Sequence, residues 1–444
     1  MAVISKRLYS FSENNNLLPR LQFGFRKKHS TSSAATLLFE LAKDRLNNGR
    51  RLYSCFFDFK KAFDFVDRSL LFIKLQILGV PFPICNLLFH ILQNLKLHIR
   101  SDSQVSDAFY STNGVPQGDP LSPLLFSLFT SNLPDSLAHI PPTLHGVSIP
   151  YLLFADDLVV LADSQEEIQI AIDSVVTFCE EFNLTINKLK TQYMVFYNGS
   201  LPVSQQTVSI GDTVLPNTNS FTYLGFTFTT RLRFSTHADH LCKKAESRIG
   251  LLFQRLPLHN LPLPSVISVF ELYVLPIFRY GLFLWFPNCS SSSHSSIDSV
   301  FTKFLKRYLR IPKHSNNALT YLLTQTEPLT YSLKNLLRSS YSSLTLPNIF
   351  SGYKPSIAEQ ISSDTVTYDP SEFLPEHYKH APIPTVLSTD PTRRHKSLKY
   401  TFDTIHYSYC NNSVFHFPND QCICKFCSQE CIFFHFQCCP VGIL

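Results

Sequence analysis

The chain has 444 residues, of which 44% are hydrophobic, and a formal net charge of +6. This length predicts two or three domains, and the hydrophobic content excludes an intrinsically disordered chain. The sequence has no N-terminal signal pattern and no run of about 18 apolar residues. We therefore expect an intracellular protein of the nucleus or cytoplasm that has no membrane partner.

The N-terminal segment is basic and leads into a helix. Within the first thirty residues, Glu13 is the single acid among several lysines and arginines, and locally basic segments suit nucleic acid. Ser30 or Thr31 can cap a helix whose apolar residues follow helical spacing, and the breaker Asn47-Asn48-Gly49 ends it.

An apolar run over residues 52–57 predicts a strand that ends at Asp58. Because an ionised carboxylate is rarely buried without a partner, we expect Asp58 at a strand end that faces a cleft. Over residues 95–100 basic and apolar residues alternate, which predicts a strand with one basic face. That face either follows a phosphate backbone or is merely solvated.

Gly114 and Gly118 precede a predicted helix that has Ser122 as its cap and Pro123 at its first position. Glycines before a helix N-terminus allow backbone donors to approach a base or a phosphate closely. The alternative interpretation is a simple tight turn around Gln117.

The most informative pattern lies at residues 151–161, where two β-prone apolar runs are separated at Asp156-Asp157. This pattern predicts a hairpin that presents paired carboxylates. Such a pair can hold Mg²⁺, which prefers carboxylate oxygens, substrate phosphates and water. On its own the pair would be read as solvated turn residues, but Asp58 supplies a candidate third carboxylate.

Strands and helices alternate around this hairpin. Ser164 and Glu167 predict a capping box that starts a helix, and residues 193–197 return as a strand. The alternation predicts an α+β fold in which helices pack on one face of a sheet.

The next region is predicted to be helical. Residues 234–285 have an apolar face and a basic side, whereas the serine run 290–293 predicts a loop. A further helix near residues 300–310 has a basic face that either contacts nucleic acid or is solvated, and the proline-rich residues 351–400 predict an irregular linker. The basic residues of the two helical faces are Lys244, Arg248 and Arg255, and Lys303, Lys306, Arg307 and Arg310.

The order of these motifs resembles the reverse transcriptase of non-LTR (LINE-type) retrotransposons. The similarity is strong from about residue 4 to residue 285 and thinner beyond. The segments that carry it are Gln22-Phe23-Gly24-Phe25-Arg26 with His29-Ser30-Thr31, then Asp58 to Val66, Gly114 to Pro123, Phe154 to Asp157, Asn187 to Thr191, and Tyr223 to Phe226.

The resemblance implies two bound Mg²⁺ ions. Asp58 and Asp156 would bridge the ions, Asp157 would close the primer side, and the main-chain carbonyl of Phe59 would add a ligand. Lys190 would protonate or neutralise the leaving pyrophosphate, unless it is an ordinary surface lysine.

The resemblance also implies how the nucleotide is bound. Gln117 and Gly118 would lie along the templating base and the incoming nucleotide, and Arg26 and Lys27 would hold the triphosphate. Phe63 would lie beneath the sugar and leave no room for a 2′-hydroxyl, whereas the alternative is a core phenylalanine.

Seven of the twelve cysteines fall between Cys410 and Cys439, and in a reducing compartment such a cluster favours metal binding over disulfides. The cluster resembles the Cys-Cys-His-Cys knuckle that ends many LINE-type chains, and such ligands suit zinc. The expected set is Cys424, Cys427, His435 and Cys439. The spacing departs from the usual one, so Cys438 is an alternative last ligand, and Cys422 and Cys431 are surplus.

Within the α+β class, the resemblance implies a right-hand polymerase with fingers, an antiparallel palm sheet and a helical thumb. We assign fingers and palm to residues 1–230, thumb and connection to 231–345, a linker to 346–409, and a small Cys/His-rich segment to 410–444.

We therefore expect an RNA-directed DNA polymerase of a non-LTR retrotransposon. Its partners would be an RNA template, a DNA primer or target, and deoxynucleoside triphosphates. The chain opens just before the Gln22 motif with no endonuclease domain ahead of it, so we interpret it as an N-terminally truncated fragment. The alternative is a truncated, catalytically inactive remnant that only binds RNA.

Overall fold

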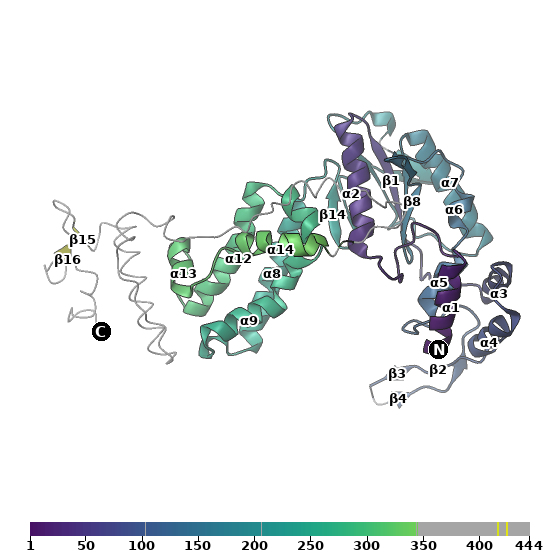
Figure 1. Cartoon of the computed structure of the whole chain (residues 1–444), viewed down its shortest axis with the longest axis horizontal. Helices are drawn as coiled ribbons and strands as arrows, with labels where there is room; N and C mark the ends of the chain where they lie inside the picture. Colours follow the sequence, from purple (N-terminus) through teal and green to yellow (C-terminus); the bar gives the residue numbers. More distant parts are fainter. Residues whose placement is uncertain (103, 206, 343, 345–414, 417–422, 425–444) are drawn as a thin grey trace. The chain divides into compact units, whose positions relative to one another are not determined.

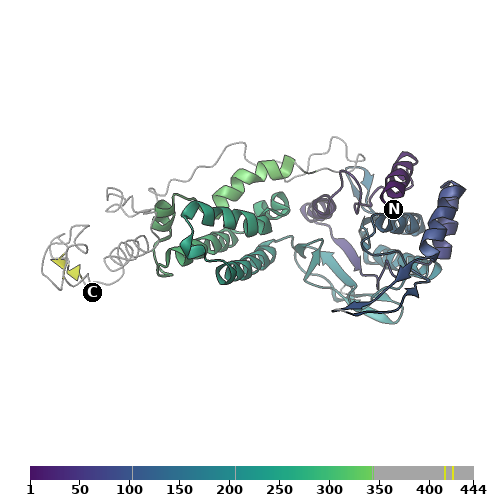
Figure 2. The same ribbon diagram turned by 90° about the horizontal axis from the view of Figure 1, so that it is seen from below.

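The computed structural model describes residues 1–102, 104–205, 207–342 and 344, together with 415–416 and 423–424. The described chain divides into two compact units, Met1–Phe234 and Ser235–Ser342. The first mixes helices with antiparallel strands and the second is helical, as Figures 1 and 2 show, which confirms the α+β class. No helix of the described residues is long and apolar enough to cross a membrane.

A four-stranded antiparallel sheet forms the centre of the first unit. Its strands are β1 (Leu52–Phe57), β8 (Tyr151–Phe154), β9 (Asp157–Ala162) and β10 (Gln192–Phe196). The order across the sheet is β10-β1-β9-β8. All six residues of β1 are buried, so the sheet is covered on both faces there.

Two long helices pack against this sheet, α2 (Thr31–Asn47) and α7 (Gln165–Glu181), as seen in Figure 1. Ser30 caps α2 as expected, because its side chain accepts the Ser33 N–H. Ser164 likewise accepts the Glu167 N–H at the start of α7. The second half of that predicted capping box is absent, since the Glu167 carboxylate accepts the Ile140 N–H instead.

Shorter helices complete the first unit. The helix predicted after Ser122 begins at Ser122 itself, with Leu121 at the cap position, so Ser122 is not the cap. The Ser122 hydroxyl instead donates to Pro116 O. The helices are α1 (Ala2–Asn14), α3 (Arg68–Ile77), α4 (Phe82–Gln93), α5 (Ser122–Phe129) and α6 (Leu133–Ser136), with a 3₁₀ turn η1 at Val203–Gln205.

The remaining strands form small antiparallel pairs. The strand expected over residues 95–100 is broken in two, because Ser106 Oγ accepts the Ile99 N–H and interrupts the ladder. The strands are β2 (Lys96–Leu97), β3 (Arg100–Ser101), β4 (Gln104–Val105), β5 (Phe109–Tyr110), β6 (Thr143–Leu144), β7 (Val147–Ser148), β11 (Thr207–Ile210), β12 (Thr213–Pro216), β13 (Ser220–Tyr223), β14 (Phe226–Thr229), β15 (Phe415–His416) and β16 (Ile423–Cys424).

The segment before α2 clamps the turn between β8 and β9. Gln22 is fully buried, and its Oε1 accepts the N–H groups of Gly24 (2.8 Å) and Ala155 (3.0 Å). The Phe23 N–H donates to Leu153 O, so the segment runs beside β8. A Cβ on Gly24 would lie 2.3 Å from Ala155 N, and only glycine allows this approach.

The second unit is a bundle of helices. It consists of α8 (Ser235–Arg255), α9 (Leu263–Tyr273), α10 (Leu275–Arg279), α11 (Leu282–Trp285), α12 (Ser291–Leu309), α13 (Asn317–Thr324) and α14 (Leu329–Ser342), with 3₁₀ turns η2 (Leu258–Asn260) and η3 (Phe286–Asn288). The prediction of a loop at residues 290–293 is wrong, because the Ser290 side chain accepts the Ser293 N–H and caps α12, which includes residues 291–293. Serine is a strong N-cap residue as well as a loop residue.

The basic face predicted for residues 300–310 is only partly exposed. Lys306 is buried, with 6% of its surface accessible, and its Nζ donates to Lys313 O, Ser315 O and Asn317 Oδ1 at 2.5–3.0 Å. Burial lowers the pKa of Lys306 to about 8. Lys306 therefore holds the chain that follows α12, whereas Lys303 is exposed and pairs with Glu246 at 2.7 Å.

We predict that Gly24→Ala destabilises the chain by about 1–3 kcal/mol, because the added methyl group collides with the Ala155 backbone. Gly250, inside α8, is the control: a Cβ there meets nothing within 4 Å, so Gly250→Ala should stabilise by about 0.5–1 kcal/mol. Thermal unfolding followed by circular dichroism measures both. Equal melting temperatures for Gly24→Ala and the wild type would contradict the clamp.

We also predict that Lys306→Met destabilises the second unit by about 2–3 kcal/mol, since three oxygen acceptors lose their donor. Lys303→Met should change the free energy of unfolding by less than about 1 kcal/mol, because its ion pair is exposed. The chain's single tryptophan, Trp285, is buried in this unit and reports its unfolding by fluorescence in urea. Equal losses for the two variants would show that Lys306 has no special structural role.

Candidate active site

The end of β1 delivers Asp58 beside β9. The two strands pair up to Phe57 and Leu158, so Asp58 and Asp157 are the next opposed positions in the same antiparallel register. Opposed residues of neighbouring strands lie on the same face of a sheet. Asn187 fixes Asp58 there: its Nδ2 donates to Asp58 Oδ2 (2.9 Å), and its N–H donates to the main-chain oxygen of Asp58 (2.7 Å).

The hairpin predicted around Asp156-Asp157 is present. Phe154 pairs with Asp157, which leaves Ala155 and Asp156 as a two-residue turn. Ala155 has a φ of 57°, a left-handed conformation that two-residue hairpin turns require and that alanine adopts reluctantly. The hydrogen bond to Gln22 holds this conformation. The turn thus presents Asp156 and Asp157 next to the end of β1.

Electrostatic repulsion links the three carboxylates. Although Asp157 is open to solvent on one side, partial burial together with the charges of Asp156 and Asp58 raises its pKa to about 6. Burial and the charge of Asp58 also raise the pKa of Asp156, against the effect of its own backbone N–H. Because the ionised forms are disfavoured, a nearby cation would stabilise them.

The donors suit a hard divalent cation. Carboxylate oxygens are preferred ligands of Mg²⁺, and the three aspartates supply them. Among the described residues, no three His, Cys, Asp or Glu side chains already form a metal cage. Mg²⁺ does not require one, since it commonly takes one or two carboxylates and keeps water and substrate phosphate. Phe59, whose carbonyl the sequence offers as a further ligand, lies in a segment bridged to Ile186.

A glycine loop over residues 114–118 is bound to the segment that follows Asp58. The Gly114 N–H donates to Val66 O and the Val115 N–H to Phe63 O, both at 2.8 Å. Gly114 has a φ of 81°, and a Cβ there would lie 2.6 Å from Asp64 O. The loop can approach this closely only because residue 114 is glycine.

Phe63 and the far end of the glycine loop differ in exposure, since Phe63 is partly covered and Gln117 and Gly118 are exposed. Phe63 is half-buried and stacks on Phe126 of α5, with ring centroids 4.8 Å apart. Gln117 Nε2 donates to Asp64 Oδ1 at 3.1 Å, while the Cβ position of Gly118 meets nothing within 4 Å. The structure therefore brings Phe63, Gln117 and Gly118 together on segments that are bonded to each other.

The basic candidates are placed differently from one another. Arg26 donates from Nε and Nη2 to Glu13, at 2.9 and 2.7 Å, and from Nη1 to Pro19 O, so its guanidinium is engaged within the chain. This pairing lowers the pKa of Glu13. Lys27 is exposed, with Nζ 5.8 Å from the centre of the Tyr9 ring. Lys190 is exposed in the loop whose Asn187 holds Asp58.

Three positioning residues were not recognised from the sequence: Gln22, Arg68 and Asn187. Gln22 is a polar residue between the apolar Leu21 and Phe23, and this interruption was a usable signal. Asn187 was visible only as part of a motif, and Arg68 gave no signal, because a charged residue at the start of a helix is normally solvated. Each of the three binds a distant partner: Arg68 binds Leu92, 24 residues away, Gln22 binds Ala155, 133 residues away, and Asn187 binds Asp58, 129 residues away.

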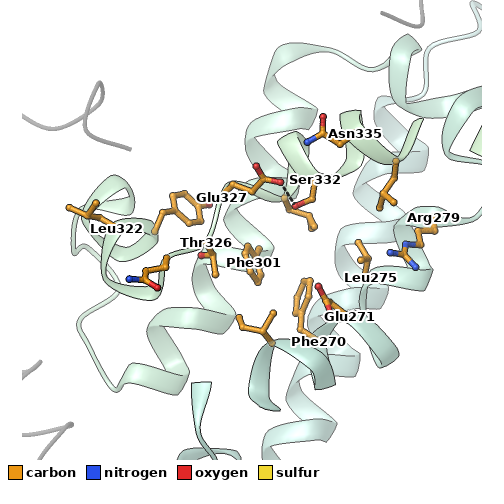
Figure 3. A pocket seen from close by; sticks show the side chains of 15 residues that line it. Phe270, Glu271, Leu275, Arg279, Phe301, Leu322, Thr326, Glu327, Ser332 and Asn335 are labelled. Atoms are coloured by element: carbon orange, nitrogen blue, oxygen red, sulfur yellow. Dashed lines mark hydrogen bonds between the residues drawn. The ribbon is translucent and has the colours of Figure 1, made fainter. Parts of the chain in front are cut away.

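The described residues also line two cavities away from the aspartates. One, of about 770 Å³, lies in the first unit and includes Lys74 and Asp135. The other, of about 700 Å³, lies in the second unit and is drawn in Figure 3. Phe270 and Phe301 line it, and Glu327 accepts a hydrogen bond from Ser332 at 2.8 Å. Neither cavity contains Asp58, Asp156 or Asp157, so we assign them no part in the chemistry.

The expected zinc ligands cannot be placed. Cys427, His435 and Cys439 lie outside the described residues, as does the alternative ligand Cys438, and only the backbone of Cys424 is described, in β16. The described part has other thiols that are buried, among them Cys55 and Cys179.

Similarity to known proteins agrees with the motifs. The polymerase of the mobile element jockey of Drosophila melanogaster is 26% identical over 321 residues, which are 70% of this chain and 34% of the relative. The probable polymerase of the X-element transposon of the same species is 27% identical, over 65% of this chain and 32% of the relative. The Pol polyprotein of its R2DM element is 26% identical, over 70% and 29%. The chain spans about a third of the length of these relatives.

Among solved structures, the telomerase of Candida albicans in complex with a fragment of telomeric RNA is 13% identical, with a TM-score of 0.38. The match covers 82% of this chain and 58% of that one, and we base no conclusion about the fold or the function on a TM-score of this size. The sequence profile described as reverse transcriptase (RNA-dependent DNA polymerase) matches residues 1–228. The chain therefore belongs to the reverse transcriptase family and is related to the polymerases of non-LTR retrotransposons, as its motifs indicated.

Proposed function

We propose that this chain itself polymerises DNA on an RNA template by two-metal nucleotidyl transfer. The observation that supports this most strongly is the meeting of three carboxylates, Asp58, Asp156 and Asp157, at one end of the central sheet. Family membership supplies the reaction class. The natural partners would be an RNA template, a DNA primer or target and deoxynucleoside triphosphates.

Asp58, Asp156 and, on the primer side, Asp157 would hold two Mg²⁺ ions, and the carbonyl of Phe59 would be an added ligand. The ions would stabilise the attacking and leaving oxygens of the phosphoryl transfer. The protein's own part is to keep the carboxylates in place before the ions arrive. Asn187 orients Asp58 through two hydrogen bonds, and Gln22 fixes the turn that carries Asp156.

The nucleotide would lie against the segment that follows Asp58. Phe63 is backed by Phe126, so its ring cannot retreat easily and would exclude a ribose 2′-hydroxyl by volume. Gln117 and Gly118 would line the templating base and the incoming nucleotide from the glycine loop.

Basic side chains would bind the triphosphate and the leaving group. Lys27 is the better candidate for the triphosphate, because Arg26 is already paired with Glu13. Lys190 is exposed in the loop that contains Asn187, and it would protonate the leaving pyrophosphate or neutralise its charge. Exposed lysines are strongly hydrated point charges that can serve this purpose.

We further propose the right-hand arrangement, with fingers and palm in the first unit and the thumb in the second. Three basic residues, Lys244, Arg248 and Arg255, are exposed on α8, opposite its buried apolar face. A stripe of positive charge on one helix face suits the phosphates of a duplex.

A zinc site formed by Cys424, Cys427, His435 and Cys439 is a separate proposal that rests on the sequence alone. Metal analysis of the purified chain tests it, and a chain without zinc would exclude it. Thiolate and imidazole ligands at such spacing suit structural zinc.

We predict that Asp58→Asn, Asp156→Asn and Asp157→Asn each reduce primer extension on RNA more than tenfold, equivalent to about 1.4 kcal/mol of barrier, and leave RNA affinity nearly unchanged. Each substitution keeps the shape of the side chain and removes one charge. The control is Asp173→Asn on the exposed side of α7, which should extend primers at the wild-type rate. Extension is measured with Mg²⁺ and deoxynucleotides, and RNA affinity by filter binding.

A variant with more than a tenth of the wild-type rate would remove that aspartate from the metal site. A wild-type chain that binds RNA but extends no primer would instead favour the remnant that only binds RNA. Mg²⁺ should also raise the melting temperature of the wild type and not that of Asp157→Asn, which tests metal binding without activity.

We predict that Phe63→Val relaxes discrimination against ribonucleotides at least tenfold, about 1.4 kcal/mol, while DNA synthesis continues. The measurement is the ratio of kcat/KM for a deoxynucleotide and its ribonucleotide counterpart, which is unaffected by loss of active protein. Phe72→Val is the control, since Phe72 is a buried phenylalanine of α3 whose loss should lower stability without changing the ratio. An unchanged ratio in folded Phe63→Val would make Phe63 a core residue.

A further inference from the structure

Arg68 is a buried cation with an unusual set of partners. It is the first residue of α3, and 3% of its surface is accessible. Nε donates to Gly114 O (2.8 Å), Nη1 to Leu92 O (2.8 Å) and Ser111 O (2.6 Å), and Nη2 to Asn113 O (3.1 Å). All four acceptors are backbone carbonyls, and a guanidinium has five N–H donors in a rigid plane to serve them.

These four carbonyls belong to two segments that meet at the glycine loop. Leu92 lies in the last turn of α4, just before the exposed strands β2 to β5, and Ser111 follows directly after β5. Asn113 and Gly114 open the glycine loop itself. One side chain thus joins both ends of the exposed hairpin region to the start of the loop.

The opposite side of the loop is held by the backbone of residues 63–66. Gly114 and Val115 donate their N–H groups to Val66 O and Phe63 O, and the backbone of Asp64 leaves no space for a side chain at residue 114. Asp67 fixes the start of α3, because its Oδ1 accepts the N–H groups of Ser69 and Leu70 at 2.8 and 3.1 Å. Arg68 therefore extends from a fixed helix start toward a loop that is bonded on its other side.

Burial makes this arrangement sensitive to substitution. A charge taken out of water must be compensated by hydrogen bonds, and among the described residues the four backbone carbonyls provide this compensation. If the guanidinium is lost, the carbonyls of Gly114, Leu92 and Ser111 lose its N–H groups, and Asn113 O keeps only the Ser111 hydroxyl as a donor. The loop then loses its second attachment. Lysine cannot replace it, since an ammonium has three donors on a flexible stem.

We propose that Arg68 is a positioning residue that locks the glycine loop against Phe63 and thereby sets the affinity and the sugar selectivity of the nucleotide site. This inference rests on the proposed polymerase function. It does not require Arg68 to touch the nucleotide. The loop carries Gln117 and Gly118 and is bonded to the backbone of Phe63, so loosening it changes both sides of the nucleotide site together.

Arg45 provides a matched control. It is equally buried, with 4% of its surface accessible, and it donates to Asp163, Asp44 and Thr143 O. Asp163 follows the end of β9 that is opposite Asp157, so Arg45 lies at the other end of the strand from the candidate site. Arg45→Met should reduce stability and leave nucleotide binding unchanged.

The experiment compares Arg68→Met, Arg68→Lys and Arg45→Met with the wild type. For Arg68→Met we expect at least a tenfold rise in KM for the deoxynucleotide, a kcat within about threefold of wild type, and a deoxy-to-ribo ratio of kcat/KM that falls at least fivefold. Arg68→Lys should lie between Arg68→Met and the wild type, and it replaces Arg68→Met if that variant does not fold. Arg45→Met should keep the wild-type KM and ratio.

Hydrogen exchange at residues 111–118 provides a readout that needs no activity. The amides of Gly114 and Val115 should exchange at least tenfold faster in the Arg68 variant than in the wild type or Arg45→Met. Unchanged exchange, or an unchanged KM and ratio in a folded Arg68 variant of an active enzyme, would overturn the inference and leave the polymerase proposal standing. If the wild type extends no primer, the polymerase proposal fails, and the exchange rates alone decide whether Arg68 locks the loop.

Discussion

Repulsion among Asp58, Asp156 and Asp157 is the force that the rest of the first unit must oppose. Three carboxylates at one end of a sheet separate unless the backbone that carries them is held. Partial burial, and after it the charges of Asp156 and Asp58, raise the pKa of Asp157, so the ionised forms are costly there. The chain holds them with contacts from distant segments: Asn187 at Asp58, and Gln22 at the turn. The helices α2 and α7 pack on the sheet that carries these contacts.

Much of this layout is predictable because it depends on local patterns. The strand before Asp58, the hairpin before and after Asp156 and the helix capped by Ser30 all follow from alternation, apolar runs and capping residues. The place of Asp58 at a strand end makes it a candidate third carboxylate, but no local signal pairs β1 with β9, so the resemblance to a known family is what assigns the three aspartates to one site. The division of the chain near residue 234 is a property of the folded contacts.

The parts that could not be predicted involve polar side chains whose partners are distant or whose burial is decided by tertiary structure. Lys306 shares a helical face with exposed lysines and arginines, yet it is buried and holds three oxygens. The serine run that begins at Ser290 suits a loop as well as a helix cap, because serine is common in both, and in the fold Ser290 is a cap. Arg26 lies in a basic run that suits phosphate binding, but its guanidinium forms an ion pair with Glu13. The sequence shows which side chains are charged or polar, but it does not show which group each of them binds in the folded chain.

The burial of β1 has a consequence for how such a gene tolerates change. All six residues of this strand are buried, and the strand is hydrogen-bonded to β9 along one edge and to β10 along the other. A single-codon insertion or deletion between Leu52 and Phe57 would shift Asp58 by one position and turn it to the opposite face of the sheet. The same event in an exposed hairpin such as β3 and β4 would leave the aspartates where they are. These few codons are therefore a short segment where the loss of one residue would take the carboxylate cluster apart while every aspartate is still encoded.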